Sequence, residues 1–216
     1  ARAQFNLAIR YDKGEGVIEN DKTAVKWYTK AAEQAHAKAQ YNLGVMYDNG
    51  YGVLENDKTA VKWYTRAAEQ GHVFGQSILG LKYANGEGVP ENDKIAVKWF
   101  TKAAEQGDAQ SQFHLGLMYD TGHGDLTNLK TAVKWYGKAA AQGHAFSQSV
   151  LGVMYANGEG VLTSNIKAYL WFNLAAYNGS KDGAQNKDVM TEQMTNEQIA
   201  KAQELSQQCL DSGYKD

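Results

Sequence analysis

The sequence predicts an all-α protein, a right-handed superhelix of five helix-turn-helix repeats closed by a C-terminal helical cap. Three sets of evenly spaced residues indicate this fold. Five tryptophans lie 36 residues apart along the 216-residue chain, at Trp27, Trp63, Trp99, Trp135 and Trp171. Leucines and glutamines keep the same interval, beginning at Leu7 and Gln4, and each repeat carries a Gly-x-Gly step such as Gly50 and Gly52. A stack of copies of one structural unit requires such an interval, whereas a single compact core does not.

The repeats span residues 1–36, 37–72, 73–108, 109–144 and 145–180, and a different segment, 181–216, follows them. No linker rich in proline, glycine or serine interrupts the interval, so we expect a single continuous domain. Ala1 already stands in phase with Ala37. We therefore expect a signal segment or further repeats upstream of the sequence.

Each repeat is predicted to contain two helices. In the second repeat, Ala39, Leu43, Gly44 and Tyr47 recur at the spacing of one helix face, which defines helix A. Glycine can adopt the left-handed conformation that ends a helix, so the Gly-x-Gly step closes helix A. In the fourth repeat Asp125 replaces the valine of this loop, and we expect the segment from Gly122 to Asn128 to differ in shape.

Helix B follows the loop, with alanine pairs and a tryptophan on its apolar face. Its first residue is placed by elimination, because the aspartates at the start of most copies are replaced by Leu129 in the fourth. One residue earlier, every copy has a good N-cap: Asn20, Asn56, Asn92, Asn128 and Ser164. The alanine pairs and Gly44, Gly80, Gly116 and Gly152 of helix A are expected to let neighbouring helices approach closely. The tryptophans are expected to fill the remaining space as packing residues.

The tail is predicted to cap the last repeat. Thr195 and Gln198 form a capping-box pattern, and Ile199, Ala202, Leu205 and Cys209 give the following helix an apolar face. We expect Cys209 to be a small buried residue, although a dimer-forming thiol remains an alternative. A lone cysteine excludes an internal disulfide framework.

Composition excludes several classes of function. The net charge of -2, from 22 basic and 24 acidic residues, argues against general nucleic-acid binding. No apolar run approaches the roughly 20 residues that span a bilayer. No catalytic triad, Cys-His pair, paired carboxylates or metal-ligand spacing occurs outside the repeat pattern, so we expect no enzymatic activity, no cofactor and no metal. The Gly-x-Gly steps follow helices and lack the strand of a phosphate-binding loop. His36, His72 and His144 recur a whole repeat apart, which indicates turn or cap residues.

These motifs resemble the Sel-one-like repeat, a tetratricopeptide-like α-solenoid unit. The similarity covers five full copies, for example the segment from Ala37 to Gly71. In addition, the tail from about Ala184 is similar to the terminal segment that such proteins often carry. The resemblance implies a bacterial adaptor that holds a partner protein or peptide, and it favours the periplasm or the cell exterior, with the cytoplasm still open. Some relatives carry paired cysteines and are linked to β-lactam binding or hydrolysis. This chain has no cysteine before Cys209, so that activity is only a remote alternative.

The resemblance also implies that helix A lines the concave surface, where a partner would bind. On the variable side of helix A, the second, sixth and ninth residues of the repeats turn from polar at the start of the chain to apolar later. Leu81 and Val153 on this side are equally consistent with packing against the next repeat. We expect Phe74 and Phe146 to be exposed, because their counterparts include Arg2 and Lys38. The predicted partner-binding residues are Phe74, Ile78, Lys82, His114, Met118, Phe146, Val150 and Met154.

Two alternatives concern other surfaces or partners. The apolar groove could close a homodimer, although we expect a monomer. A basic stripe on helix B, which begins with Lys22, Lys26 and Lys30, could meet an acidic surface. Glutamates and aspartates dilute the stripe, so a solvated face is the favoured interpretation.

Overall fold

The computed structural model describes residues 1–214, and these residues form twelve α-helices, one short 3-10 helix and no strand. The predicted all-α solenoid of helix pairs is confirmed. Backbone contacts divide the chain into two compact units, 1–106 and 107–216, which we describe separately as unit 1 and unit 2. The last two residues of the predicted cap, 215–216, lie outside the described residues.

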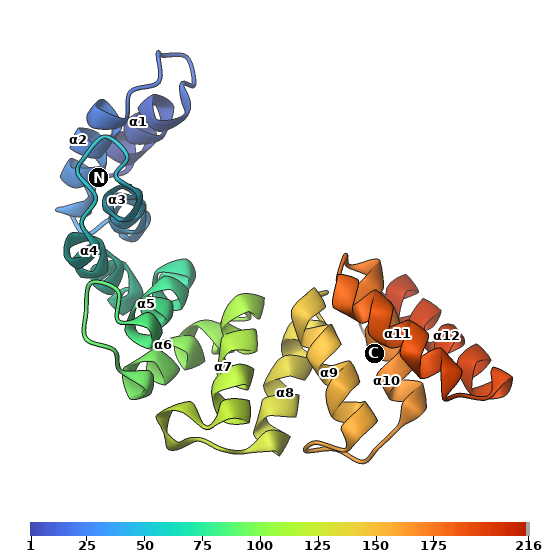
Figure 1. Cartoon of the computed structure of the whole chain (residues 1–216). Coiled ribbons are helices and arrows are strands. Elements are labelled where there is room, and N and C mark those ends of the chain that lie inside the picture. The colour runs from blue at the N-terminus through green and yellow to red at the C-terminus, as the bar shows by residue number, and fades with distance from the viewer. Residues whose placement is uncertain (215–216) are drawn as a thin grey trace. The chain divides into compact units, whose positions relative to one another are not determined.

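Unit 1 contains three helix pairs, and each helix packs on the next in chain order (Figure 1). Their bounds are α1 (Arg2–Lys13), α2 (Asp21–Ala32), α3 (Ala37–Asn49), α4 (Asp57–Glu69), α5 (Val73–Asn85) and α6 (Asp93–Glu105). Odd-numbered helices are the predicted helix A of each repeat and even-numbered helices are helix B. The loop between them carries the Gly-x-Gly step.

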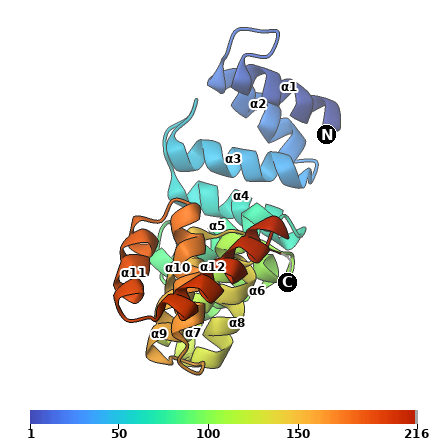
Figure 2. The same ribbon diagram turned by 90° about the vertical axis from the view of Figure 1, so that its right-hand side faces the viewer.

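Unit 2 contains two further pairs and two terminal helices. Their bounds are α7 (Ala109–Thr121), α8 (Leu129–Ala140), α9 (Ala145–Asn157), α10 (Asn165–Tyr177), α11 (Lys181–Glu192) and α12 (Asn196–Asp211), with the 3-10 helix η1 (His123–Asp125) between α7 and α8. Both α11 and α12 pack on α10, and Figure 2 shows these three helices together. The predicted difference of the fourth loop is confirmed, because η1 occurs there and Asp125 adopts a left-handed φ of 64°.

The predicted N-caps of helix B are confirmed. The side chains of Asn20, Asn56, Asn92, Asn128 and Ser164 each accept a hydrogen bond from the backbone N–H three residues later. Residue 36 of each repeat caps the helix that follows it, which is α3, α5, α7, α9 or α11: His36, His72, Asp108, His144 and Ser180. The histidines accept through Nδ1, as from the Gly75 N–H to His72 at 3.1 Å. The cap role predicted for the three histidines is therefore confirmed.

In the second to fifth repeats, helix A and helix B meet at a glycine of helix A. A Cβ on Gly116 would lie 2.7 Å from Cδ1 of Tyr136, and a Cβ on Gly80 would lie 2.7 Å from Cδ1 of Phe100. Real side chains do not approach this closely, so the ring and the backbone are in direct contact. The aromatic residue that follows each tryptophan is at most 3% exposed: Tyr28, Tyr64, Phe100, Tyr136 and Phe172.

The tryptophans lie nearer the surface than we predicted. Trp99 is buried, but the other four rings are only half-buried. Four of the five tryptophan rings lie under a cationic side chain of the next helical turn, such as Lys30 over Trp27 at 4.4 Å and Arg66 over Trp63 at 4.7 Å. A tryptophan combines a large apolar surface with an N–H group, so it fits a helix edge with one wet side.

A glutamine at the fourth residue of each repeat joins helices through polar contacts. The buried Gln40 side chain donates to the Ala32 carbonyl at 3.0 Å and accepts from Gln70 at 2.5 Å. Gln76 and Gln148 make the same contacts in their repeats. Gln40, Gln76 and Gln148 each satisfy a carbonyl at the end of the preceding helix B, which gives a physical reason for the periodic glutamine.

The terminal helices close unit 2. Thr195 and Gln198 form the predicted capping box at the start of α12. Ala202 and Met190 join Ala168, Tyr169 and Phe172 in one apolar cluster, with Ile199 and Met194 at its edge. Cys209 is half-buried rather than buried. Within residues 1–214, no helix has the length and apolar character needed to cross a bilayer.

Candidate partner-binding surface

Two of the predicted partner-binding residues are clearly exposed. Phe74, in the first turn of α5, exposes 59% of its surface, and Phe146, in the first turn of α9, exposes 67%. Ile78, His114 and Val150 are half-buried one turn further along their helices. Large exposed aromatic rings beside apolar side chains are typical of interaction surfaces.

Three of the predicted residues are buried and do not contribute to an exposed surface. Met118 is 6% exposed, Met154 is 1% exposed and Lys82 is 7% exposed. They share the tenth position of their repeats, where helix A turns toward the core. At this position helix A is covered by its neighbours. We correct the predicted surface by leaving these three residues out.

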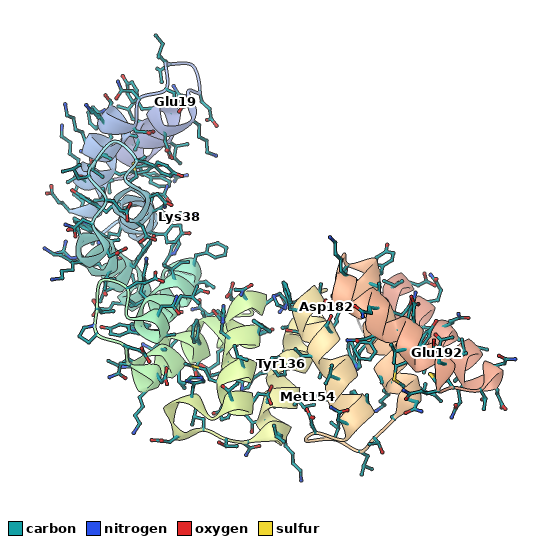
Figure 3. All side chains as sticks on the ribbon, in the orientation of Figure 1. Glu19, Lys38, Tyr136, Met154, Asp182 and Glu192 are labelled. Atoms are coloured by element: carbon teal, nitrogen blue, oxygen red, sulfur yellow. The ribbon has the colours of Figure 1, made fainter. Side chains whose placement is uncertain are left out.

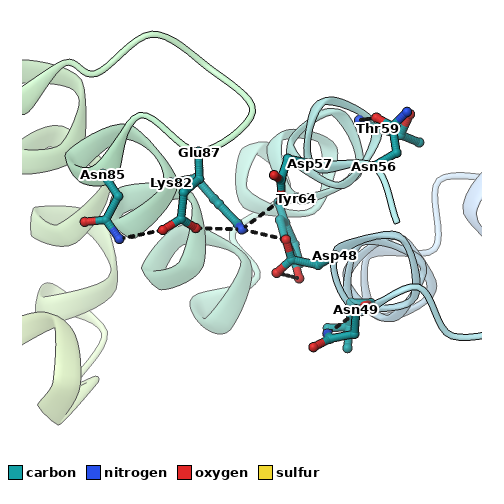
Figure 4. A network of polar contacts seen from close by, with 10 residues as sticks. Asp48, Asn49, Asn56, Asp57, Thr59, Tyr64, Lys82, Asn85 and Glu87 are labelled. Atoms are coloured by element: carbon teal, nitrogen blue, oxygen red, sulfur yellow. Dashed lines mark hydrogen bonds and ion pairs between the residues drawn. The ribbon is translucent and has the colours of Figure 1, made fainter. Parts of the chain in front are cut away.

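Lys82 is buried because three carboxylates surround its ammonium group (Figure 4). Its Nζ lies 2.6 Å from Oδ1 of Asp48, 2.8 Å from Oε2 of Glu87 and 3.3 Å from Oδ1 of Asp57. Burial by itself lowers the pKa of Lys82, but the contacts with Asp48 and Glu87 outweigh burial and raise the pKa above its usual value. The cluster joins α3, α4 and α5, so we interpret it as a structural contact between the second and third repeats.

Phe74 belongs to an aromatic cluster in unit 1. The rings of Tyr41 and His72 stack with centroids 4.8 Å apart and planes 24° apart. The ring centroid of Phe74 lies 6.3 Å from that of Tyr41 and 6.1 Å from that of His72. We call Tyr41, His72 and Phe74 the unit-1 aromatic cluster. Tyr41 and His72 pack against one part of the Phe74 side chain, and the rest of its surface is exposed to solvent.

Phe146 belongs to a matching cluster in unit 2. The ring centroids of Phe113 and His144 lie 5.0 Å apart. The ring centroid of Phe146 lies 6.4 Å from that of Phe113 and 6.2 Å from that of His144. We call these three residues the unit-2 aromatic cluster. Gln110 contacts Nε2 of His114 at 2.8 Å and Nε2 of His144 at 3.3 Å, which fixes the polar edge of this cluster.

The two clusters occupy equivalent positions, 72 residues apart. Their centroid distances differ by only about 0.1 to 0.2 Å from one cluster to the other, so the same local geometry occurs twice. Phe74 and Phe146 were predicted from the sequence, whereas the rings that contact them were not: Tyr41, His72, Phe113 and His144. A signal was present. Where residue 36 of a repeat is histidine, its fifth residue is Phe or Tyr, and where residue 36 is Asp108 or Ser180, the fifth is Ser77 or Ser149.

The pKa of each cap histidine lies below its usual value. Burial lowers the pKa of His72, and the Lys38 charge lowers it further. Burial also lowers the pKa of His144, against the opposing effect of Asp108. A neutral imidazole is required here, because Nδ1 must accept the hydrogen bond that caps the next helix.

A cavity adjoins Phe146. It has a volume of about 390 Å³ and is lined by Phe146, Asn178, Ser180, Lys181 and Asp182, among others. Asp182 lies in the first turn of α11, where Figure 3 labels it. The cavity is large enough for one side chain of a bound segment beside the exposed ring. Within residues 1–214, no group of three His, Cys, Asp or Glu side chains is arranged to hold a metal ion.

Helix pairs stacked through glycine and alanine contacts define an α-solenoid scaffold. The model of the Sel1 repeat family matches residues 1–36, 37–72, 73–108, 109–144 and 145–180. The protein therefore belongs to the Sel1 repeat family. This fold commonly mediates protein–protein interaction, and its members are generally scaffolds. Among curated proteins, we found no match to the sequence.

Solved structures from bacteria agree with this assignment. A protective antigen of uropathogenic Escherichia coli, c5321, has 35% identity and a TM-score of 0.87 over 97% of this chain, and this chain spans 45% of that protein. A Sel1 repeat protein of Oxalobacter formigenes has 40% identity and a TM-score of 0.80, over 83% of this chain and 74% of that protein. Cysteine-rich protein B of Helicobacter pylori has 24% identity and a TM-score of 0.50, over 61% of this chain and 94% of that protein, which shows the fold alone.

Proposed function

We propose that this protein is a non-enzymatic scaffold that binds partner protein segments on the helix A face of its repeats. Phe74 is the apolar anchor in unit 1, with Ile78 one turn further along α5, and Phe146 is the anchor in unit 2, with Val150 one turn further along α9 and His114 on α7. The observation that carries this proposal is the repeated cluster. Two phenylalanines, exposed by 59% and 67%, each rest on the same aromatic support 72 residues apart.

Exposure of this kind carries an energetic cost unless a partner covers the ring. Each phenylalanine would gain roughly 1.5 to 3 kcal/mol from full burial, since its apolar surface would leave water. The support beneath each ring also restricts its motion, so little conformational entropy is lost on binding. Rigid, partly exposed aromatic rings are the side chains that most often dominate binding energy at protein interfaces.

The experiment compares the wild-type protein with the Phe74→Ser/Phe146→Ser variant as baits in extract of the bacterium that carries the chain. We expect the wild-type protein to retain a discrete partner that the variant loses. The matched control is Leu54→Ser/Leu162→Ser, because these leucines are 90% exposed at loops in the two units and lie outside the helix A face. The control should retain the partner.

Three outcomes would contradict the proposal. Equal retention by all three baits would show that the phenylalanines are not anchors. A large loss of thermal stability in the Phe74→Ser/Phe146→Ser variant would show that they are core residues. Light scattering of the purified protein decides the remaining alternative. A tight dimer that the double variant dissociates would assign the same face to self-association.

A further inference from the structure

The helix A face of unit 1 is positively charged beside its aromatic anchor. The second residues of the first three repeats are Arg2, Lys38 and Phe74, and all three are exposed in the first turn of α1, α3 and α5. Figure 3 labels Lys38 at this end of α3. Equivalent positions in successive repeats share one face of the stack, so two cations precede the phenylalanine along this face.

Carboxylates do not neutralise these first turns. No acidic residue occurs in the first turn of α1, α3 or α5, whereas every helix B of unit 1 begins with an aspartate: Asp21, Asp57 and Asp93. Arg2 and Lys38 form no ion pair within residues 1–214. The N-terminal ends of helices carry partial positive charge, which adds to the two side-chain charges.

The same cations lower the pKa of the cap histidines His36 and His72. Burial is the main cause of the lowered pKa of His36, the N-terminal ammonium group of Ala1 is the next, and Lys38 and Arg2 lower the pKa further. Lys38 also lowers the pKa of His72, whose ring centroid lies 6.1 Å from that of Phe74. Lys38 is thus near both cap histidines, and it connects the cationic end of the face to the unit-1 aromatic cluster.

Unit 2 lacks this charge. The second residues of its fourth and fifth repeats are Gln110 and Phe146, and the equivalent residue of the cap is Asp182. Burial lowers the pKa of His114 and of His144, and the carboxylate of Asp108 opposes this shift at both histidines. The two aromatic clusters therefore share their geometry and differ in electrostatic surroundings.

We infer that the helix A face of unit 1 selects a partner segment in which acidic residues stand beside an apolar side chain. The apolar side chain packs on Phe74, and the carboxylates face Lys38 and Arg2. This inference rests on the proposed function and adds the chemical class of the partner. Because the cations are exposed, they discriminate between partners and accelerate encounter more than they add affinity, and salt screens them.

The test uses a phage-displayed library of random peptides, selected on the wild-type protein after depletion on the Phe74→Ser variant. Depletion removes clones that bind elsewhere. We expect Asp and Glu to be at least about twofold enriched in the retained peptides, near an aromatic or aliphatic residue. Binding of these clones should weaken about two- to fivefold in Lys38→Glu, and also when salt rises from about 0.05 to 0.3 M.

The control is Lys58→Glu, which makes the same charge change at an exposed residue in the first turn of α4, a helix B. It should leave binding unchanged. Retained peptides without acidic enrichment, or equal losses in Lys38→Glu and Lys58→Glu, would overturn the inference while leaving the proposed function intact. A selection that retains no peptide dependent on Phe74 would overturn the inference and contradict the proposed function of unit 1.

Discussion

The imidazole of His72 stacks on the ring of Tyr41 at 4.8 Å while its Nδ1 accepts the Gly75 N–H at 3.1 Å. One side chain thus supports the exposed Phe74 and caps the helix that carries it. The same pairing of roles occurs at His144, which contacts Phe113 and accepts from the Ser147 N–H at 3.2 Å. The local stability of α5 and α9 is therefore coupled to the protonation of one histidine each.

Acidification should destabilise the protein through these caps. The folded-state pKa of His36, His72 and His144 lies below the usual 6.5, so the folded protein binds fewer protons than the unfolded chain. Their contribution to stability is complete above the unfolded pKa and is lost as the pH falls through the folded pKa. We expect the free energy of unfolding, measured with urea, to fall between about pH 7 and pH 5.

The His72→Asn variant isolates one of these contributions. Asparagine is a good N-cap at any pH in this range, so the variant should be close to wild type at pH 7 and should lose less stability at pH 5. An identical pH dependence in the variant and the wild-type protein would show that His72 does not titrate with unfolding. The Tyr41 contact is weakened in the variant, so only the slope against pH is diagnostic.

The glycines of unit 2 offer a matched pair of substitutions. Gly116→Ala places a methyl group 2.7 Å from the Tyr136 ring, and we expect the free energy of unfolding to fall by about 1 to 3 kcal/mol because the helices must separate. Gly137→Ala, in α8, meets nothing within 4 Å and should raise stability by about 0.4 to 1 kcal/mol. Urea unfolding of both variants tests the contact, and similar effects of the two substitutions would refute it.

A double-mutant cycle tests the charge cluster between repeats. Lys82→Met should leave Asp48 with its Tyr64 contact, because Tyr136 makes the same contact with Asp120 in unit 2, where Met154 occupies the position of Lys82. We expect Lys82→Met and Asp48→Asn each to reduce stability, with a coupling energy of about 1 to 3 kcal/mol because the residues share one network. Additive losses would show that the 2.6 Å contact contributes nothing to stability.

The repeat interval allowed much of the fold to be predicted from the sequence. Asn128 revealed the cap of helix B because the neighbouring Leu129 could not accept a hydrogen bond, and the structure confirms that cap. Burial within the repeat was harder to predict. The periodic tryptophan predicts a buried packing residue, yet the next residue is more deeply buried. Trp99 is 8% exposed and Phe100 is 1% exposed, because the Phe100 ring faces Gly80 of helix A.

The candidate site was predictable only in its exposed members. Phe74 and Phe146 stand out because charged residues occupy their position in other repeats. Met118, Met154 and Lys82 were wrongly included, since spacing along one helix does not reveal which turns a neighbouring helix covers. Lys82 was the hardest to place, because its burial depends on Asp48, Asp57 and Glu87, and no spacing rule identifies that encounter.

The C-terminal helix α12 should be required for the solubility of the last repeat. Deleting residues 195–216 uncovers the apolar cluster that contains Ala168, Tyr169 and Phe172, so we expect a lower melting temperature and aggregation. Ala202→Glu should act in the same direction, because Ala202 is 0% exposed and a buried carboxylate without a partner is costly. Ala200→Glu makes the same substitution on the exposed side of α12 and should be nearly neutral. Differential scanning calorimetry with light scattering distinguishes these cases, and an unchanged melting curve in the deletion would show that α12 does not cap the repeats.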